Sequence, residues 1–357
     1  MKILVLSNLI SYTYNFRKEI IETFVSKGHE VVVVCDVDDV SKRDELERIC
    51  RIIDVPFHGK GTNPKEELKL IGTYSAIMRS EKPDILFSFT IKMNLYGGLV
   101  AKRLYIPYVP MITGLGELEK EGKLKKLLMF LHKRVMPKAK CIVFQNEDNR
   151  DFFKRNGIAF KRSLVVPGSG INLDKFKVQP YPTEGKTVFG FLGRFIEAKG
   201  VSEFLKCAED MASDDILFIA AGTMDDKYKE LVERLVEEGK LRYDGELADS
   251  RGFLEEASCL VLPTYHPEGL SNVILEACAT GRPVICTPRT GCKEIVEDGV
   301  NGFYCSARDV DNLESVLKRF LSLPNEERMR MGENGRRIVE GRFDRKIVVA
   351  EYLSLLE

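Results

Sequence analysis

Residues 261–302 read VLPTYHPEGLSNVILEACATGRPVICTPRTGCKEIVEDGVNG, and this stretch decides the fold class of the second half of the chain. An apolar strand is followed by a short loop and by a helix of small and apolar residues between Gly269 and Gly281. Such a unit points backbone N–H groups at the helix N-terminus, where an anion is favoured. Glu268 lies at this mouth, and Glu276 follows eight residues later, about two turns deeper at 3.6 residues per turn. The two carboxylates can reach two parts of one long ligand.

Short apolar runs alternate with stretches of helical spacing along the chain that leads up to this segment. KILVLS, EVVVVC, ILFSFT and YVPMIT precede it, and TVFGFLG, ILFIAAG and CLVLPT lie closer to it. Near-continuous apolar strands that alternate with helices indicate parallel sheets covered on both faces. Residues 168–186 are rich in Pro and Gly and predict an interdomain linker. We therefore predict an α/β protein with two doubly wound domains, residues 1–167 and 187–342, and a final helix in 343–357.

Bulk composition excludes several classes of protein. With 357 residues, 44% hydrophobic and 30% charged, the chain is typical of a globular protein of two domains. It has no apolar run of about 20 residues, and its first residues lead directly into a strand, so we expect neither a membrane helix nor a secretory signal. Nine scattered cysteines and four histidines argue against a structural metal and for reduced, buried thiols in the cytoplasm.

The charge is unevenly distributed. Residues 1–167 contain 29 Lys and Arg against 20 Asp and Glu, so the remainder is acidic by the same margin because the whole chain is neutral. The basic half should meet something anionic. Residues 123–138, KLKKLLMFLHKRVMPK, combine cations with leucines at helical spacing and predict peripheral contact with an anionic membrane. The alternative is an ordinary surface helix whose apolar face covers the sheet.

Three motifs together resemble one enzyme family. They are the 261–302 run, with its pair of glutamates, the segment GRFIEAKG (193–200), and the set NPKEELKL (63–70), KPDILFSFTIKMNLYGG (82–98) and ITGLG (112–116). The chain resembles retaining GT-B glycosyltransferases of family 4, in the branch that extends lipid-linked or capsular saccharides. The resemblance implies two Rossmann-like domains facing a cleft, and a last helix that crosses back to the first domain.

The resemblance also implies a catalytic set. Arg194 and Lys199 would neutralise the diphosphate of a departing nucleotide, since fixed cations lower the barrier to its release. Glu268 would contact the transferred sugar, either as a nucleophile or only to position it, and Glu276 would accept hydrogen bonds from the ribose. The plainer alternatives are a surface ion pair with Glu197 for the cations and helix capping for Glu268.

Further binding residues are expected at the ends of strands. For the donor they are Gly193, Gly222, Asp244, Gly245, Gly269, Leu270, Ser271, Asn272 and Val273. For the acceptor they are Thr13, Asn15, Arg17, Thr90, Lys92, Asn94, Thr113 and Gly114. We interpret the polar residues of the loop after the first strand as helix caps. N-capping alone explains Asn15 as well as contact with a substrate does. This loop lacks G-x-G-x-x-G, which counts against a dinucleotide-binding dehydrogenase.

These features lead to one functional hypothesis. We expect transfer of a hexose or N-acetylhexosamine, with retention, from a UDP-sugar to a polyprenyl-diphosphate-linked saccharide at the cytoplasmic face of the inner membrane. We expect no metal requirement and no nucleic-acid partner. The alternatives are a UDP-sugar 2-epimerase of the same fold and a non-catalytic subunit that binds sugar nucleotides.

Overall fold

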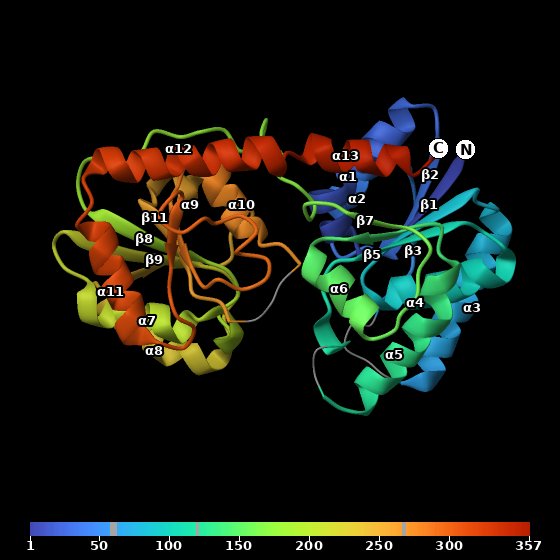
Figure 1. Ribbon diagram of the computed structural model, residues 1–357, viewed down its shortest axis with the longest axis horizontal. Coiled ribbons are helices and arrows are strands. Elements are labelled where there is room, and N and C mark those ends of the chain that lie inside the picture. The colour runs from blue at the N-terminus through green and yellow to red at the C-terminus, as the bar shows by residue number, and fades with distance from the viewer. Residues whose placement is uncertain (58–62, 119–120, 266–268) are drawn as a thin grey trace. The chain divides into compact units, whose positions relative to one another are not determined.

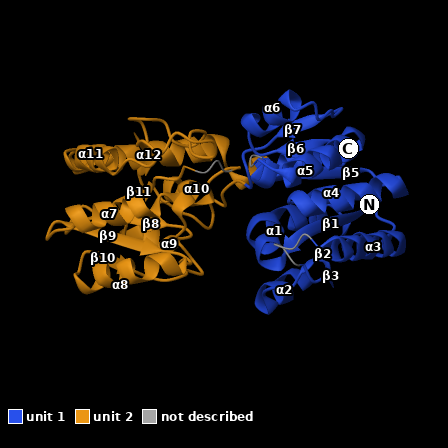
Figure 2. Cartoon of the chain, turned by 90° about the horizontal axis from the view of Figure 1, so that it is seen from below, with its two compact units in different colours: residues 1–169, 348–357 blue, residues 170–347 orange. Residues whose placement is uncertain are grey.

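The computed structural model describes residues 1–57, 63–118, 121–265 and 269–357 (Figure 1). The chain divides into two compact units (Figure 2). Unit 1 comprises Met1–Ser169 together with Val348–Glu357, and unit 2 comprises Gly170–Ile347. Residues 170–186, most of the expected linker, therefore belong to unit 2.

A seven-stranded parallel sheet forms the centre of unit 1, in the order β3-β2-β1-β4-β5-β6-β7. Its strands are β1 (Lys2–Leu9), β2 (Glu30–Asp36), β3 (Arg51–Asp54), β4 (Ile85–Phe89), β5 (Tyr108–Ile112), β6 (Ile142–Phe144) and β7 (Ser163–Val165). Successive side chains of a strand point to opposite faces, so Ile3 and Val5 enter one apolar cluster and Leu4 and Leu6 enter another.

Helices cover both faces of this sheet. They are α1 (Ile10–Ser26), α2 (Val40–Glu47), α3 (Pro64–Glu81), α4 (Ile91–Leu104), α5 (Lys123–Val135), α6 (Glu147–Arg155) and the second half of α13 (Arg345–Ser354). The cluster on one face includes Phe24 of α1 and Tyr352 of α13. The cluster on the other face includes Met78 of α3, Leu95 of α4 and Val135 of α5. Both faces are thus buried, as near-continuous apolar strands require.

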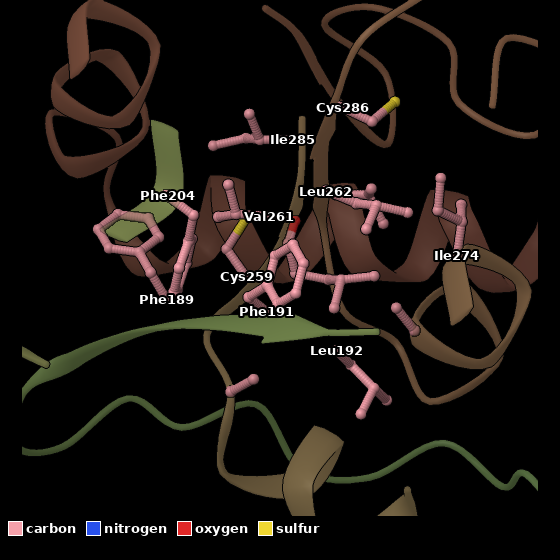
Figure 3. Close-up of a cluster of buried hydrophobic side chains, with 14 of the residues drawn as sticks. Phe189, Phe191, Leu192, Phe204, Cys259, Val261, Leu262, Ile274, Ile285 and Cys286 are labelled. Atoms are coloured by element: carbon pink, nitrogen blue, oxygen red, sulfur yellow. Dashed lines mark hydrogen bonds between the residues drawn. The ribbon is translucent and has the colours of Figure 1, made fainter. Parts of the chain in front are cut away.

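Unit 2 contains a second parallel sheet, in the order β10-β9-β8-β11-β12-β13. Its strands are β8 (Thr187–Leu192), β9 (Ile216–Ala221), β10 (Leu241–Tyr243), β11 (Cys259–Leu262), β12 (Val284–Cys286) and β13 (Gly302–Tyr304). Its helices are α7 (Val201–Met211), α8 (Lys229–Glu237), α9 (Arg251–Glu256), α10 (Asn272–Ala279), α11 (Val310–Leu321) and α12 (Asn325–Arg342). Figure 3 shows Phe189, Val261 and Ile274, from β8, β11 and α10, in its core.

Strand order reverses once in each sheet, between β1 and β4 in unit 1 and between β8 and β11 in unit 2. Ligands of doubly wound proteins bind outside the carboxyl ends of the strands at such a reversal. The prediction of two doubly wound α/β domains is confirmed. All nine cysteines are free and buried. Within the described ranges, none of the helices combines the length and apolar character needed to cross a bilayer.

Candidate functional site

The ends of β8, β9 and β10 lie side by side along the carboxyl edge of the sheet of unit 2, and β8 borders the strand reversal. The Gly193 N–H donates to the Ala221 carbonyl at 3.0 Å, and the Gly222 N–H donates to the Gly245 carbonyl at 2.7 Å. A Cβ atom at Gly222, whose φ is +137°, would lie 2.0 Å from the Gly193 carbonyl oxygen. Only glycine permits this approach. The structure therefore brings three of the predicted donor-binding residues to one edge of the sheet.

Arg194 follows Gly193 and is exposed at this edge. Among the described residues its guanidinium has no ion-pair partner. A purely structural role for Arg194 would pair it with Glu197. The Glu197 carboxylate instead lies 3.5 Å from the Lys227 ammonium. The Arg194 cation is consequently open to an anionic ligand.

Lys199 lies in the short 3-10 turn Glu197–Lys199 and is partly buried. This turn is bonded to the end of β11, because the Thr264 hydroxyl and the Tyr265 N–H donate to the Ala198 carbonyl at 3.0 and 3.1 Å. The loops that follow β8 and β11 are thus joined. Two motifs about 70 residues apart in the sequence meet at the strand reversal.

Helix α10 begins at Asn272, later than the sequence predicts. Ser271 is held outside the helix in an extended conformation, and its N–H donates to the Gly291 carbonyl at 2.9 Å. Gly269 and Leu270 therefore precede the helix, whereas Asn272 and Val273 lie in its first turn. The side chain of Ser271 makes no capping hydrogen bond, so the first-turn N–H groups keep the polarity that favours an anion.

Glu276 lies about one turn into α10, and not two turns deep as the sequence predicts. Its carboxylate Oε2 accepts a hydrogen bond from the Ser250 hydroxyl at 2.6 Å. Burial raises the pKa of Glu276, while the Ser250 bond and the charge of Lys175 act in the opposite direction. Glu268 and His266, which the sequence places at the mouth of the helix, lie outside the described residues.

Asp244 lies at the end of β10, and its side chain is already paired. Both carboxylate oxygens accept from Arg242, through Nε and Nη2 at 2.9 Å each. Arg242 in turn contacts Glu256. The Asp244 N–H donates to the Ala220 carbonyl at 2.9 Å, which keeps the β10 loop beside β9.

Among the acceptor residues, those after β1 differ from the expectation. Helix α1 begins at Ile10, directly after the strand, so the polar residues from Ser11 to Arg17 lie inside the helix and the expected capping by Asn15 is wrong. The cap comes from another loop, because Asp38 accepts from the N–H and hydroxyl of Ser11 at 3.0 and 2.5 Å. Thr13 is buried and donates to the Leu9 carbonyl at 2.9 Å.

Arg17 is buried as well. Its guanidinium donates to the Ser169 hydroxyl at 2.7 Å and to the Phe16 carbonyl at 2.8 Å, and it stacks 4.4 Å from the centre of the Phe89 ring. These contacts favour a structural role over contact with an acceptor. Asn15, two residues earlier in α1, is exposed.

The turn between β4 and α4 contains a strained residue. Thr90 has φ +73°, a value that few non-glycine residues adopt and that recurs at functional sites. Asn94 is buried and bonds inside the protein, because it accepts from the Ser88 hydroxyl at 2.8 Å and donates to the Met111 carbonyl at 2.7 Å. This arrangement favours a structural role for Asn94 and leaves Thr90 at the edge.

Lys92 connects two of the sequence motifs. Its ammonium lies 2.6 Å from Oε1 of Glu67, in the first turn of α3, so the 63–70 and 82–98 segments meet through one ion pair. Sequence reasoning did not identify Glu67 as a partner. Thr113 and Gly114 follow β5, the next strand of the sheet, and both are partly exposed.

Two family models match most of the chain. One, described as glycosyl transferases group 1, matches residues 174–338, and the other, described as glycosyl transferase 4-like, matches residues 2–146. The N,N'-diacetylbacillosaminyl-diphospho-undecaprenol α-1,3-N-acetylgalactosaminyltransferase of Campylobacter jejuni is 26% identical over all of this chain and 98% of its own length. The capsular polysaccharide biosynthesis glycosyltransferase CapM of Staphylococcus aureus is 26% identical over 81% of this chain and 80% of its own.

Solved structures show the same fold. The sucrose-phosphate synthase of Thermosynechococcus elongatus superposes with a TM-score of 0.81 at 17% identity, covering 100% of this chain and 98% of its own. Anabaena Alr3699/HepE in complex with UDP and glucose superposes with a TM-score of 0.80 at 18% identity, covering 100% and 99%. The predicted family and fold are confirmed. The chain belongs to the group 1 glycosyltransferases and has the GT-B fold.

Proposed function

We propose that this glycosyltransferase moves a hexose or N-acetylhexosamine, with retention, from a UDP-sugar to a polyprenyl-diphosphate-linked saccharide. The observation that carries the proposal is that Arg194, at the strand reversal of unit 2 beside the turn of Lys199, has no ion-pair partner among the residues that the structure describes. The names of the two relatives, one of which acts on a diphospho-undecaprenol acceptor, support a role in surface polysaccharide or glycan synthesis.

The proposed chemistry relies on fixed positive charge. As the bond between the sugar C1 and the diphosphate breaks, negative charge gathers on UDP, and Arg194, Lys199 and the N-terminus of α10 stabilise it. The acceptor hydroxyl forms the new bond to C1 on the face that UDP leaves, and its proton passes to the departing phosphate oxygen. In this scheme no metal ion is required, because these groups supply the positive charge.

The donor and acceptor are assigned to different units. Glu276 would accept a hydrogen bond from the ribose of the donor, and Glu268 would contact the transferred sugar. Unit 1 would bind the acceptor through the edge formed by Thr90, Lys92 and the Thr113–Gly114 turn. Thr90 contributes a strained backbone at this edge, and Lys92, whose ammonium is paired with Glu67, would lie beside the bound saccharide diphosphate.

Peripheral membrane contact is proposed for helix α5, because a polyprenyl acceptor resides in a bilayer. Three apolar side chains of this helix are exposed, Leu124, Leu127 and Phe130, and the neighbouring Lys123 and Lys126 are also exposed. A helix that shows both apolar and cationic groups to solvent fits the interface of an anionic membrane. The cytoplasmic face of the inner membrane is the proposed location.

Arg194→Ala tests the proposal, with Arg234→Ala as the matched control. Purified protein is incubated with a panel of UDP-sugars and lipid-diphosphate saccharides, and products are identified by mass spectrometry. We expect acceptor glycosylation that persists in EDTA, with kcat reduced roughly 10²- to 10³-fold in Arg194→Ala. Arg234 is an exposed arginine paired with Glu209 on a distant helix face, and its loss should leave kcat unchanged.

Other outcomes would contradict the proposal. Formation of a C2 epimer without transfer would identify a 2-epimerase. Binding of UDP-sugar without turnover on any acceptor would identify a non-catalytic subunit. Equal kcat values for Arg194→Ala and Arg234→Ala would remove Arg194 from the mechanism.

A further inference from the structure

Ser250 occupies a capping position but does not cap its helix. It is the residue immediately before α9, where a serine side chain commonly accepts a hydrogen bond from the first turn. Here the hydroxyl makes no such bond. It donates instead to Oε2 of Glu276, which is 26 residues further along the chain and belongs to another helix. The Ser250 side chain therefore bonds to a residue of α10, and not to α9, the helix that it precedes.

This hydrogen bond engages one of the two oxygens of the Glu276 carboxylate and leaves the other able to accept from a ligand. An ionised carboxylate has two oxygens that can each accept more than one hydrogen bond. Ser250 engages Oε2, and Oε1 has no hydrogen-bond partner among the described residues. The terminal torsion of a glutamate is broad, so a donor on one oxygen is what restricts the direction in which the other one points.

The surroundings argue against a purely stabilising role for this pair. Burial disfavours the ionised form of Glu276 and raises its pKa. The charged groups that face it are Lys175 and Arg345, which favour the ionised form, and Asp249, which opposes it. A partly buried charge held by one neutral donor stabilises a fold poorly compared with an uncharged side chain, and such groups are concentrated at functional sites.

We propose that Ser250 is a positioning residue for the donor nucleotide, which fixes the Glu276 carboxylate so that Oε1 accepts a hydrogen bond from a ribose hydroxyl. This inference rests on the proposed function, because it takes uridine diphosphate as the ligand of unit 2. Ser250 touches Glu276 and not the reacting atoms. Its loss should therefore affect recognition of the ribose more than the chemical step.

The test compares the affinities of UDP, 2′-deoxy-UDP and 3′-deoxy-UDP by calorimetry. The full-length wild type should prefer UDP over one of the deoxy analogues by roughly tenfold to a hundredfold, the value of a hydrogen bond to a charged group. Ser250→Ala should reduce this preference several-fold, and Ser250→Thr, which keeps the hydroxyl, should restore it. Ser322→Ala is the control, because the exposed Ser322 hydroxyl donates to the Arg319 carbonyl at the end of its own helix, α11.

A double-variant cycle makes the test independent of general destabilisation. In a Glu276→Ala background, Ser250→Ala should cause no further change in the ribose preference, because the group that Ser250 positions is absent. An unchanged preference in Ser250→Ala, or a wild type that does not distinguish the deoxy analogues, would overturn the inference and leave the transferase proposal intact. A wild type that does not bind UDP would overturn both.

Discussion

Glu276 is a single residue at which the proposed function and stability conflict. Burial raises its pKa, so the folded protein holds this proton to a higher pH than the unfolded chain, in which a glutamate ionises near about 4.3. The contribution of the Glu276 carboxyl to the free energy of unfolding therefore falls as the pH rises from the unfolded pKa through the raised folded pKa. At neutral pH the ionised side chain is a net cost to folding.

Replacing this charge should stabilise the protein at neutral pH. Glu276→Gln retains an oxygen that can accept from Ser250, and we expect it to raise the free energy of unfolding by about 1 kcal/mol at pH 7.5. The gain should vanish at about pH 3, below the pKa of the unfolded glutamate, where the carboxyl is protonated in both states. Urea unfolding at the two pH values checks this, with the exposed Glu333→Gln as control. A gain of the same size at both values would show that charge is not its cause.

Single residues also show what the sequence could predict. Arg194 and Glu276 were predicted because their signals are local, a strand-to-turn junction and a spacing within one segment. Ser250 was not predicted, because its contact crosses 26 residues and its position resembles an ordinary helix cap. Arg17 and Asn94 follow strands as ligand contacts do, but their polar groups bond inward, and only the packed structure distinguishes the two cases.

At the scale of elements, helix α5 divides its apolar residues between two surroundings. Leu128, Leu131 and Val135 pack on the core of unit 1, as the surface-helix alternative requires. Leu127 and Phe130 are each 54% exposed and are not explained by that packing. The helix therefore has an outward apolar edge in addition to its inward one.

If the outward apolar edge of α5 contacts a membrane, a charge placed on it should weaken vesicle binding. Leu127→Asp should weaken co-flotation with vesicles rich in phosphatidylglycerol by about tenfold, since it adds a negative charge and removes apolar area. Val236→Asp is the matched control, because Val236 is an exposed apolar residue of a helix in unit 2. Wild-type flotation should decline as salt is raised. Equal loss in both variants, or none in Leu127→Asp, would exclude α5 as the membrane contact.

The boundaries of elements were predicted less well than the elements themselves. Strands such as ILFSFT and TVFGFLG were recognisable because both of their faces are apolar. The start of α1 was not, because Asp38, which caps it, comes from a loop beyond β2. The start of α10 was placed too early for a similar reason, since the Gly291 carbonyl holds Ser271 outside the helix.

At the scale of the whole molecule, unit 1 is assembled from both ends of the sequence. Tyr352 of α13 is fully buried, with its ring centre 5.7 Å from that of Phe87 and 6.2 Å from that of Phe89. Its hydroxyl lies 2.9 Å from the Met111 sulfur. The apolar stripe of KIVVAEYLSLLE does not itself specify which core it joins, so from sequence the return to unit 1 was expected only through the family resemblance.

Loss of this ring should weaken one unit and spare the other. Tyr352→Ala should lower the stability of unit 1 by about 3–5 kcal/mol, as removal of a large buried aromatic does, whereas Tyr352→Phe should cost much less. Calorimetry can follow the two units if UDP is added to identify the transition of unit 2. A shift of the UDP-sensitive transition alone would contradict the assignment of α13 to unit 1.

This discontinuous assembly sets an order of events during synthesis. The ribosome must add all of Gly170–Ile347 between Ser169 and Val348, so the first part of unit 1 lacks Tyr352 for as long as unit 2 is being made. At about 5–20 residues per second, this interval is on the order of ten seconds or more. Throughout it Phe87 and Phe89 have no aromatic neighbour from α13, and the nascent first unit is the part of the molecule that a chaperone would most need to shield.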